Sequence, residues 1–274
     1  MTPEQVEREY NNRALVPDFQ QYFDRWKSES EMVRATLPCE LDAAYGPHAR
    51  HRVDLFKLPK PRGTMVFIHG GYWRSLDKSL FAGVAAAWMA EKMNVALVNY
   101  RLCPEVRIED IVDDIVAATN WLYANGPARG FAMDRVVFSG HSAGGHLVAA
   151  LFATPRERLA FDPATVAGGV PISGIFDFEP MPHFSGNAEF RLDAAAVARL
   201  DLLQRERSIA APLVVAAGGL ESNEFRRQSR DLASAWAPQV KEHLVLPGRH
   251  HFSVVDAFTE PGDPLHSATR ALIA

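Results

Sequence analysis

Cysteine is scarce in this sequence, with two residues, Cys39 and Cys103, among 274. Neither forms a Cys-x-x-Cys pair or the Cys/His spacing that is typical of a zinc site. The sequence therefore supports neither a disulfide framework nor structural zinc. We expect two free thiols and no bound metal.

Long apolar runs and clusters of one charge sign are also missing. The uncharged apolar stretches are too short to span a membrane, and the first residues, MTPEQVEREYNNR, lack the apolar core of a secretory signal. The net charge is −4, and lysine and arginine are dispersed without a basic stripe. This pattern argues against binding to nucleic acid or to an anionic membrane. A cytoplasmic location is the resulting expectation.

What the sequence does have is a regular alternation of strand-like and helix-like segments. Its 274 residues, 47% of them hydrophobic, can fill a sizeable core and contain no repeat or low-complexity linker. Residues 52–58 alternate like a half-buried strand, and five denser apolar runs are expected to be central strands: 64–70, 94–100, 135–140, 166–174 and 212–219. The alternation predicts an α/β fold with a mostly parallel central sheet and helices on both faces.

One of the intervening segments, residues 107–123, has apolar residues at the spacing of a helix that packs one stripe against the sheet. Asp113 and Asp114 are adjacent acidic residues in this segment, and we expect both on its solvated side. Paired carboxylates can perform acid–base chemistry, but on an exposed helix face they are more often solvated. We assign them no catalytic role.

Two regions fall outside the alternation. Residues 1–35 are predicted to be helical and amphipathic, and residues 175–210 form a proline-containing insertion between two expected strands. An insertion of that length in an α/β sheet is often a cap or lid. Neither region is large enough to argue for a second domain, so we expect a single domain over residues 1–274.

The sequence Gly140-His141-Ser142-Ala143-Gly144 lies between a strand and a helix. Such a Gly-x-Ser-x-Gly turn (residues 140–144) holds the serine hydroxyl above the carboxyl edge of the sheet, because small flanking residues permit a tight backbone. The helix N-terminus that follows can stabilise an oxyanion, and Ala143 would supply one N–H group. The alternative is that Ser142 only caps the helix.

A second glycine motif, FIHGGYW (residues 67–73), directly follows an expected strand. In this HGG loop (residues 69–73) the N–H groups of Gly71 and Tyr72 can complete an oxyanion hole above Ser142. The alternative is an ordinary glycine-rich turn. We expect His69 to fix the loop by hydrogen bonding, and Tyr72 and Trp73 either to line a substrate pocket or to pack.

A serine nucleophile needs a base within hydrogen-bond reach and an acid that orients the base. Glu221 follows the expected strand 212–219, and His250 and His251 follow the next strand, in KEHLVLPG. Carboxyl ends of strands are where an open α/β sheet gathers its ligand-binding residues. Glu224 and Asp256 are the alternative acids, and Glu221 could instead belong to a solvated loop.

These stretches resemble the kynurenine formamidase (arylformamidase) group of α/β-hydrolases. The resemblance covers nearly the whole chain through EREYNNRALVPDF, FIHGGYW, GHSAGGHL, SGIFDFEPM, ESNEFRRQS and HHFSVVD. It implies the α/β-hydrolase fold, with Ser142 as nucleophile, Glu221 as acid and His251, which precedes a phenylalanine, as base. Many relatives have aspartate at the acid position, so the glutamate is a departure. Tyr72 stands where related esterases have the third glycine of an HGGG loop, and His250 occupies a variable position that we assign to substrate binding.

The resemblance also implies a reaction. Two-step acyl transfer would cleave an aryl formamide, above all N-formylkynurenine, into kynurenine and formate in tryptophan catabolism, without metal or organic cofactor. The partner would be a small-molecule substrate rather than nucleic acid or membrane, and a homodimer is left open. A carboxylesterase for small acyl or aryl esters is the main alternative. A non-catalytic ligand receptor on the same fold is remote, since every catalytic element is present.

Overall fold

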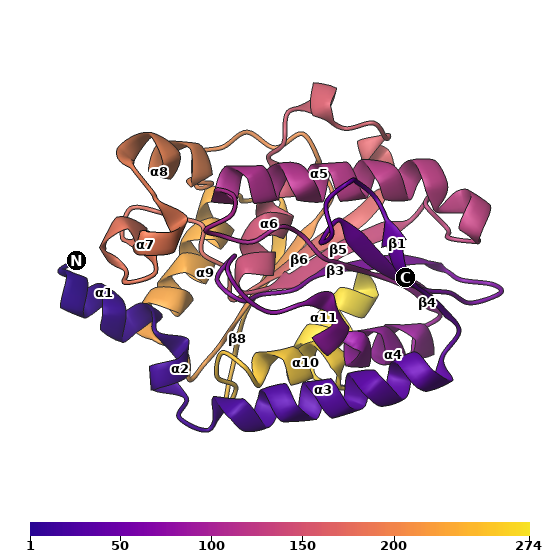
Figure 1. Cartoon of the computed structure of the whole chain (residues 1–274), viewed down its shortest axis with the longest axis horizontal. Coiled ribbons are helices and arrows are strands. Elements are labelled where there is room, and N and C mark those ends of the chain that lie inside the picture. Colours follow the sequence, from indigo (N-terminus) through magenta and orange to yellow (C-terminus); the bar gives the residue numbers. More distant parts are fainter.

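Eight strands form one sheet in the computed structural model, which describes residues 1–274 (Figure 1). Their order is β1-β2-β4-β3-β5-β6-β7-β8. β1 is antiparallel to β2, β2 is antiparallel to β4, and the six strands β3 to β8 run parallel to one another. The strands are β1 (Cys39–Ala44), β2 (Arg52–Phe56), β3 (Gly63–Ile68), β4 (Met93–Val98), β5 (Val136–His141), β6 (Val166–Ile172), β7 (Leu213–Gly218) and β8 (Val240–Leu246). The predicted mostly parallel sheet is confirmed.

The five apolar runs expected to be central strands correspond to β3 through β7. Their residues are almost all buried, which is why they lack the alternation of a half-exposed strand. The strand β1 was not predicted. Five of its six side chains are at least partly exposed, so its sequence, CELDAA, carries no apolar signal.

Helices cover both faces of the sheet. They are α1 (Pro3–Tyr10), α2 (Asn12–Leu15), α3 (Phe19–Thr36), α4 (Ala82–Ala90), α5 (Ile108–Asn125), α6 (Ala143–Phe152), α7 (Asn187–Phe190), α8 (Ala194–Leu200), α9 (Asn223–Ala235), α10 (Val254–Thr259) and α11 (Pro264–Ala271). None of them combines the length and the apolar content needed to cross a membrane.

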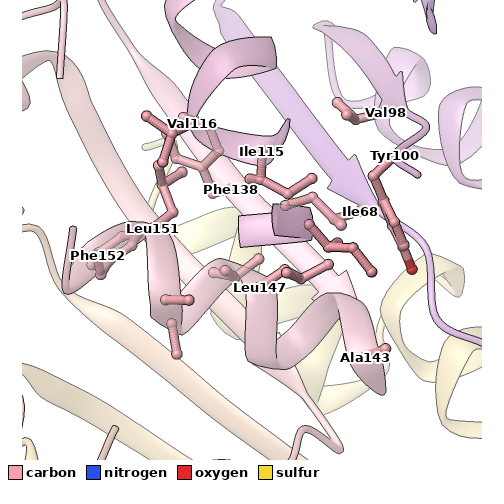
Figure 2. Close-up of a cluster of buried hydrophobic side chains, with 14 of the residues drawn as sticks. Ile68, Val98, Tyr100, Ile115, Val116, Phe138, Ala143, Leu147, Leu151 and Phe152 are labelled. Atoms are coloured by element: carbon pink, nitrogen blue, oxygen red, sulfur yellow. The ribbon is translucent and has the colours of Figure 1, made fainter. Parts of the chain in front are cut away.

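The alternation of side chains along each strand divides the core in two. Val66 and Ile68 of β3 pack with the residues of α5 and α6, whereas Met65 and Phe67 of the same strand pack with those of α4 and α10. Figure 2 shows the first of these clusters, where Ile68, Val98 and Phe138 of the sheet meet Ile115 of α5 and Leu147 of α6. Burial on both faces fixes the register of the strands and hence the positions of their carboxyl ends.

The two regions outside the alternation contain helices. The first 36 residues contain α1, α2 and α3, and residues 175–210 contain a 3₁₀ turn (Met181–His183), α7 and α8. The first region is thus helical, as expected. That the second acts as a cap, and that residues 1–274 form one domain, stay predictions.

The expectation that Asp113 and Asp114 both face solvent is wrong for Asp114. This residue is 3% exposed, and its carboxylate accepts hydrogen bonds from the backbone N–H of Arg101 (2.9 Å) and from its guanidinium (2.6 Å). Asp113, one residue earlier on α5, is exposed and pairs with Arg158. Consecutive helix residues point about 100° apart, and Arg101 approaches α5 from the loop after β4. The helical pattern could not reveal this tertiary partner.

Asp114→Ala should therefore destabilise the fold by about 2–3 kcal/mol, because it leaves a half-buried guanidinium and a backbone N–H without their acceptor. Asp113→Ala is the matched control and should change the free energy of unfolding by no more than about 0.5 kcal/mol. Chemical denaturation of both variants measures the difference. Equal losses of stability would show that the Asp114 contact contributes nothing.

Candidate active site

The Gly-x-Ser-x-Gly turn joins β5 directly to α6 and forces Ser142 into an unusual backbone conformation, with φ 57° and ψ −119°. The neighbouring glycines are required by close backbone contacts. A Cβ added to Gly144 would lie 1.9 Å from the carbonyl oxygen of Ile68, and one added to Gly140 would lie 2.4 Å from that of Gly144. The Ser142 side chain makes no capping hydrogen bond to α6, which removes the helix-cap alternative.

A continuous chain of hydrogen bonds connects Ser142, His251 and Glu221. The Ser142 Oγ lies 3.0 Å from Nε2 of His251, and Nδ1 of His251 lies 2.8 Å from Oε2 of Glu221. All three residues are buried. A carboxylate only accepts hydrogen bonds, so Nδ1 carries the proton, and Nε2 is free to accept the proton of the serine hydroxyl. The arrangement can activate Ser142 as a nucleophile.

The glutamate in the acid position is held by two further hydrogen bonds. Its Oε1 accepts from the backbone N–H of Gly218 (2.6 Å) and from the hydroxyl of Ser173 (2.5 Å). These contacts fix the longer glutamate side chain, so that its second oxygen reaches His251. Ser173 follows β6 with a positive φ of 50°, and sequence reasoning missed it. Its place at the carboxyl end of a strand was the available signal.

The two other acidic residues considered for this role are bound elsewhere. Glu224 accepts a hydrogen bond from the hydroxyl of Tyr10 (2.9 Å) and pairs with Arg227 (2.8 Å). Asp256 pairs with Arg25 at 2.8 Å. Neither contacts a histidine, so Glu221 is the residue that the fold brings to His251.

His141, inside the Gly-x-Ser-x-Gly turn, fixes the loop that carries the base. Its Nε2 lies 2.7 Å from the backbone carbonyl oxygen of His251. Burial and the neighbouring His251 lower the pKa of His141 well below its usual value, so its ring is neutral and donates this hydrogen bond. Sequence reasoning did not identify this contact between residues that are far apart in the chain.

The HGG loop passes directly over the serine. A Cβ on Gly70 would lie 3.0 Å from the Cβ of Ser142. The carbonyl oxygen of Gly71 accepts from the N–H groups of Arg74 and Ser75, at 3.1 and 3.0 Å. Because a trans peptide holds its C=O and N–H on opposite sides, the N–H of Tyr72 points away from that turn. The N–H groups of Gly71 and Tyr72 have no backbone acceptor.

Ala143 is the third residue expected to donate an N–H group to the oxyanion hole. It is the first residue of α6, where a backbone N–H has no acceptor within the helix. His69 supports the loop as expected, because its ring lies 2.7 Å from the carbonyl oxygen of Gly70 and 3.0 Å from the side-chain oxygen of Asn99. Burial lowers the pKa of His69 to about 4, which keeps its ring neutral.

A cavity of about 260 Å³ opens above Ser142 and His251. Gly71 and Tyr72 of the HGG loop line it. Part of its lining was not predicted and comes from the first 36 residues and from the insertion. These residues are Asn11, Asn12, Arg13, Phe23, Trp26, Phe184, Ser185 and Glu189. The sequence showed the first of these segments only as an amphipathic helical region.

Two of the expected substrate-binding residues do not reach this cavity. Trp73 is fully buried; its Nε1 donates to Nδ1 of His146 (3.3 Å), and its ring packs against Phe178. His250 is turned away, with Nε2 3.0 Å from the hydroxyl of Tyr22 on α3. Both assignments are corrected. Trp73 packs, and His250 fastens its loop to the N-terminal segment.

The model of a family described as having the alpha/beta hydrolase fold matches residues 65–226, more than half of the chain. The kynurenine formamidase of Salmo salar is 23% identical over 95% of this chain and 92% of its own length. That of Drosophila melanogaster is 29% identical over 50% of this chain and 46% of its own. A solved structure from Silicibacter sp. TM1040, described as a "putative thioesterase", covers 98% of both chains with 33% identity and a TM-score of 0.87.

The hydrogen bond between Glu221 and His251 predicts how fast Ser142 reacts with a fluorophosphonate probe. Glu221→Gln should slow labelling of Ser142 by roughly 100-fold or more, because His251 loses the carboxylate that fixes its tautomer. Mass spectrometry of the labelled peptide against time gives the rate. Glu224→Gln is the matched control and should label at close to the wild-type rate. If Glu224→Gln has the larger effect, Glu221 is not the orienting acid.

Proposed function

The chain belongs to the alpha/beta hydrolase fold family, and from that premise we propose that it cleaves aryl formamides, above all N-formylkynurenine, into the arylamine and formate. The chain of contacts from Ser142 through His251 to Glu221 beneath the cavity carries the proposal of a serine mechanism. The resemblance to kynurenine formamidases over nearly the whole chain supports the choice of substrate.

The reaction begins with the serine. His251 Nε2 takes the proton of the Ser142 hydroxyl as Oγ attacks the formyl carbon. We expect the N–H groups of Gly71, Tyr72 and Ala143 to stabilise the negative charge that develops on the carbonyl oxygen. Glu221 stabilises the positive charge on the imidazolium.

Two proton transfers complete the turnover. His251 donates its proton to the nitrogen of the leaving arylamine, which leaves a formyl ester on Ser142. A water molecule then replaces the arylamine; His251 removes its proton, and the collapse of the second tetrahedral intermediate releases formate. The same residues thus serve both half-reactions.

The aromatic residues beside the serine support the proposal of a small acyl group and an aromatic leaving group. Tyr72 lies next to the serine, and its ring stacks on Phe184 with centroids 5.1 Å apart. Its hydroxyl donates to the backbone carbonyl oxygen of Tyr10, which holds the ring in place. A formyl group needs almost no acyl pocket, and aromatic walls suit an arylamine.

An esterase or thioesterase is the second candidate. It would use the same three residues, and the relative described as a "putative thioesterase" is 33% identical over 98% of this chain. The two candidates differ in what binds on the acyl side and in the strength of the bond to be broken. The relative rates on defined substrates therefore distinguish the two candidate functions from each other.

Ser142→Ala should reduce hydrolysis of any substrate by roughly 10⁴-fold or more, because the nucleophile is lost while the fold is kept. Ser185→Ala, which alters another serine of the same cavity, should retain close to wild-type turnover. The assay is steady-state hydrolysis, with the melting temperature as a check on folding. A Ser142→Ala variant that retains a tenth of the activity excludes this residue as the nucleophile.

The ratio of kcat/KM for N-formylkynurenine to that for short p-nitrophenyl esters decides the substrate class, because it compares transition-state stabilisation directly. We expect the formamide to be preferred. Efficient hydrolysis of acetyl or butyryl esters without formamide turnover would assign the esterase function instead. Where both react, Tyr72→Ala should shift the preference toward longer acyl groups, and no shift means that Tyr72 does not limit the acyl side.

A further inference from the structure

The cavity has an unsatisfied polar group in the wall formed by the N-terminal segment. Asn12 lines the cavity and is 4% exposed, yet its side-chain Nδ2 has no hydrogen-bond partner. A buried amide without a partner costs free energy, and such groups are uncommon in folded proteins. A ligand that accepts a hydrogen bond would satisfy it.

The next residue, the exposed Arg13, supplies a positive charge beside Asn12. Arg13 lines the cavity, and no carboxylate lies within ion-pair distance of its guanidinium. Its carbon Cζ instead lies 5.3 Å from the centre of the Phe19 ring and 5.7 Å from that of Phe23. These aromatic contacts orient the side chain without neutralising its charge.

The remaining charges of the cavity do not balance Arg13. Arg74 and Glu189 also line it, but they pair with each other at 2.5 Å. Two arginines and one glutamate leave one positive charge, and the ring of His141 is neutral. The side chains that line the cavity therefore include one positive charge without an ion-pair partner, on the exposed Arg13, which can pair with a negatively charged group of a ligand.

We propose that Asn12 and Arg13 bind a carboxylate at the far end of the substrate's leaving group. The proposal rests on the proposed function and deepens it: N-formylkynurenine has its formamide on an aromatic ring and an α-amino acid, with its carboxylate, at the end of a side chain. In this arrangement the formyl group lies at Ser142 and the side chain extends toward Asn12 and Arg13, which line the same cavity. Arg13 provides a charge-assisted hydrogen bond, and Asn12 provides the amide donor.

The subsite makes Asn12 and Arg13 positioning residues that select the substrate without touching the reacting atoms. Binding energy from such a remote group orients the formamide above the serine. A purely structural role fits Asn12 poorly, since its buried Nδ2 makes no hydrogen bond within the protein.

The test compares two formamides that differ at the proposed carboxylate. N-formylkynurenine carries the amino acid end, and 2-formamidoacetophenone lacks it. Arg13→Gln and Asn12→Asp should each lower kcat/KM for N-formylkynurenine at least tenfold, mainly through KM, because the first removes the positive charge and the second introduces a negative one. Both variants should hydrolyse 2-formamidoacetophenone within twofold of the wild-type rate.

Arg8→Gln is the matched control. It removes an exposed arginine five residues away that does not line this cavity, and it should leave both substrates unaffected. The KM of the wild-type enzyme for N-formylkynurenine should also rise with ionic strength, whereas that for the neutral formamide should not. Equal effects of Arg13→Gln on both formamides, or no effect on either, refute the subsite.

Equilibrium binding separates this proposal from the proposed function. Calorimetry with kynurenine and with 2-aminoacetophenone needs no turnover, and wild-type protein should bind kynurenine at least tenfold more tightly, with the difference lost in Arg13→Gln. Failure to hydrolyse either formamide overturns the function alone. Failure to prefer kynurenine overturns the subsite, whichever substrate is hydrolysed.

Discussion

The close contact between the backbones of Gly144 and Ile68 is the constraint on which the rest of the site depends. It brings the first turn of α6 against the end of β3, so that Ser142 must adopt its positive φ and point above the sheet. The same contact brings the HGG loop, which follows β3, over the serine. One steric requirement thus positions both Ser142 and the loop that carries the N–H groups of Gly71 and Tyr72.

The parallel sheet then brings the partners of Ser142 to the same edge. β7 and β8 end beside each other, and the turns that follow them supply Glu221 and His251. The contacts from Ser173 and His141 fix these turns from β6 and β5. Four neighbouring strands therefore share the positioning of three side chains, and each of these side chains is buried before substrate arrives. Such preorganisation is what electrostatic catalysis requires.

The N-terminal segment is attached to the loops around Ser142 and lines the cavity above it. The hydroxyl of Tyr72 donates to the backbone of Tyr10, and His250 contacts Tyr22, so the segment is attached to two of the loops that surround the serine. It contributes Asn12 and the neighbouring Arg13 to the cavity. The sheet and its loops position Ser142, His251 and Glu221, while the segment that precedes them provides part of the cavity wall.

The sequence by itself determined the central strands, the tight turn at Ser142 and the HGG loop, because apolar burial and local backbone sterics are encoded within a few consecutive residues. It also gave Glu221 as a candidate, while the residues alone left His250 and His251 open until the family resemblance selected the latter. Only the tertiary structure decided which acid reaches the base, that Trp73 is packed rather than lining the cavity, and that Asp114 is buried. It also brought the N-terminal wall to the serine. These outcomes depend on contacts between residues far apart in the chain, whose side-chain directions follow from register and loop geometry and leave no local pattern in the sequence.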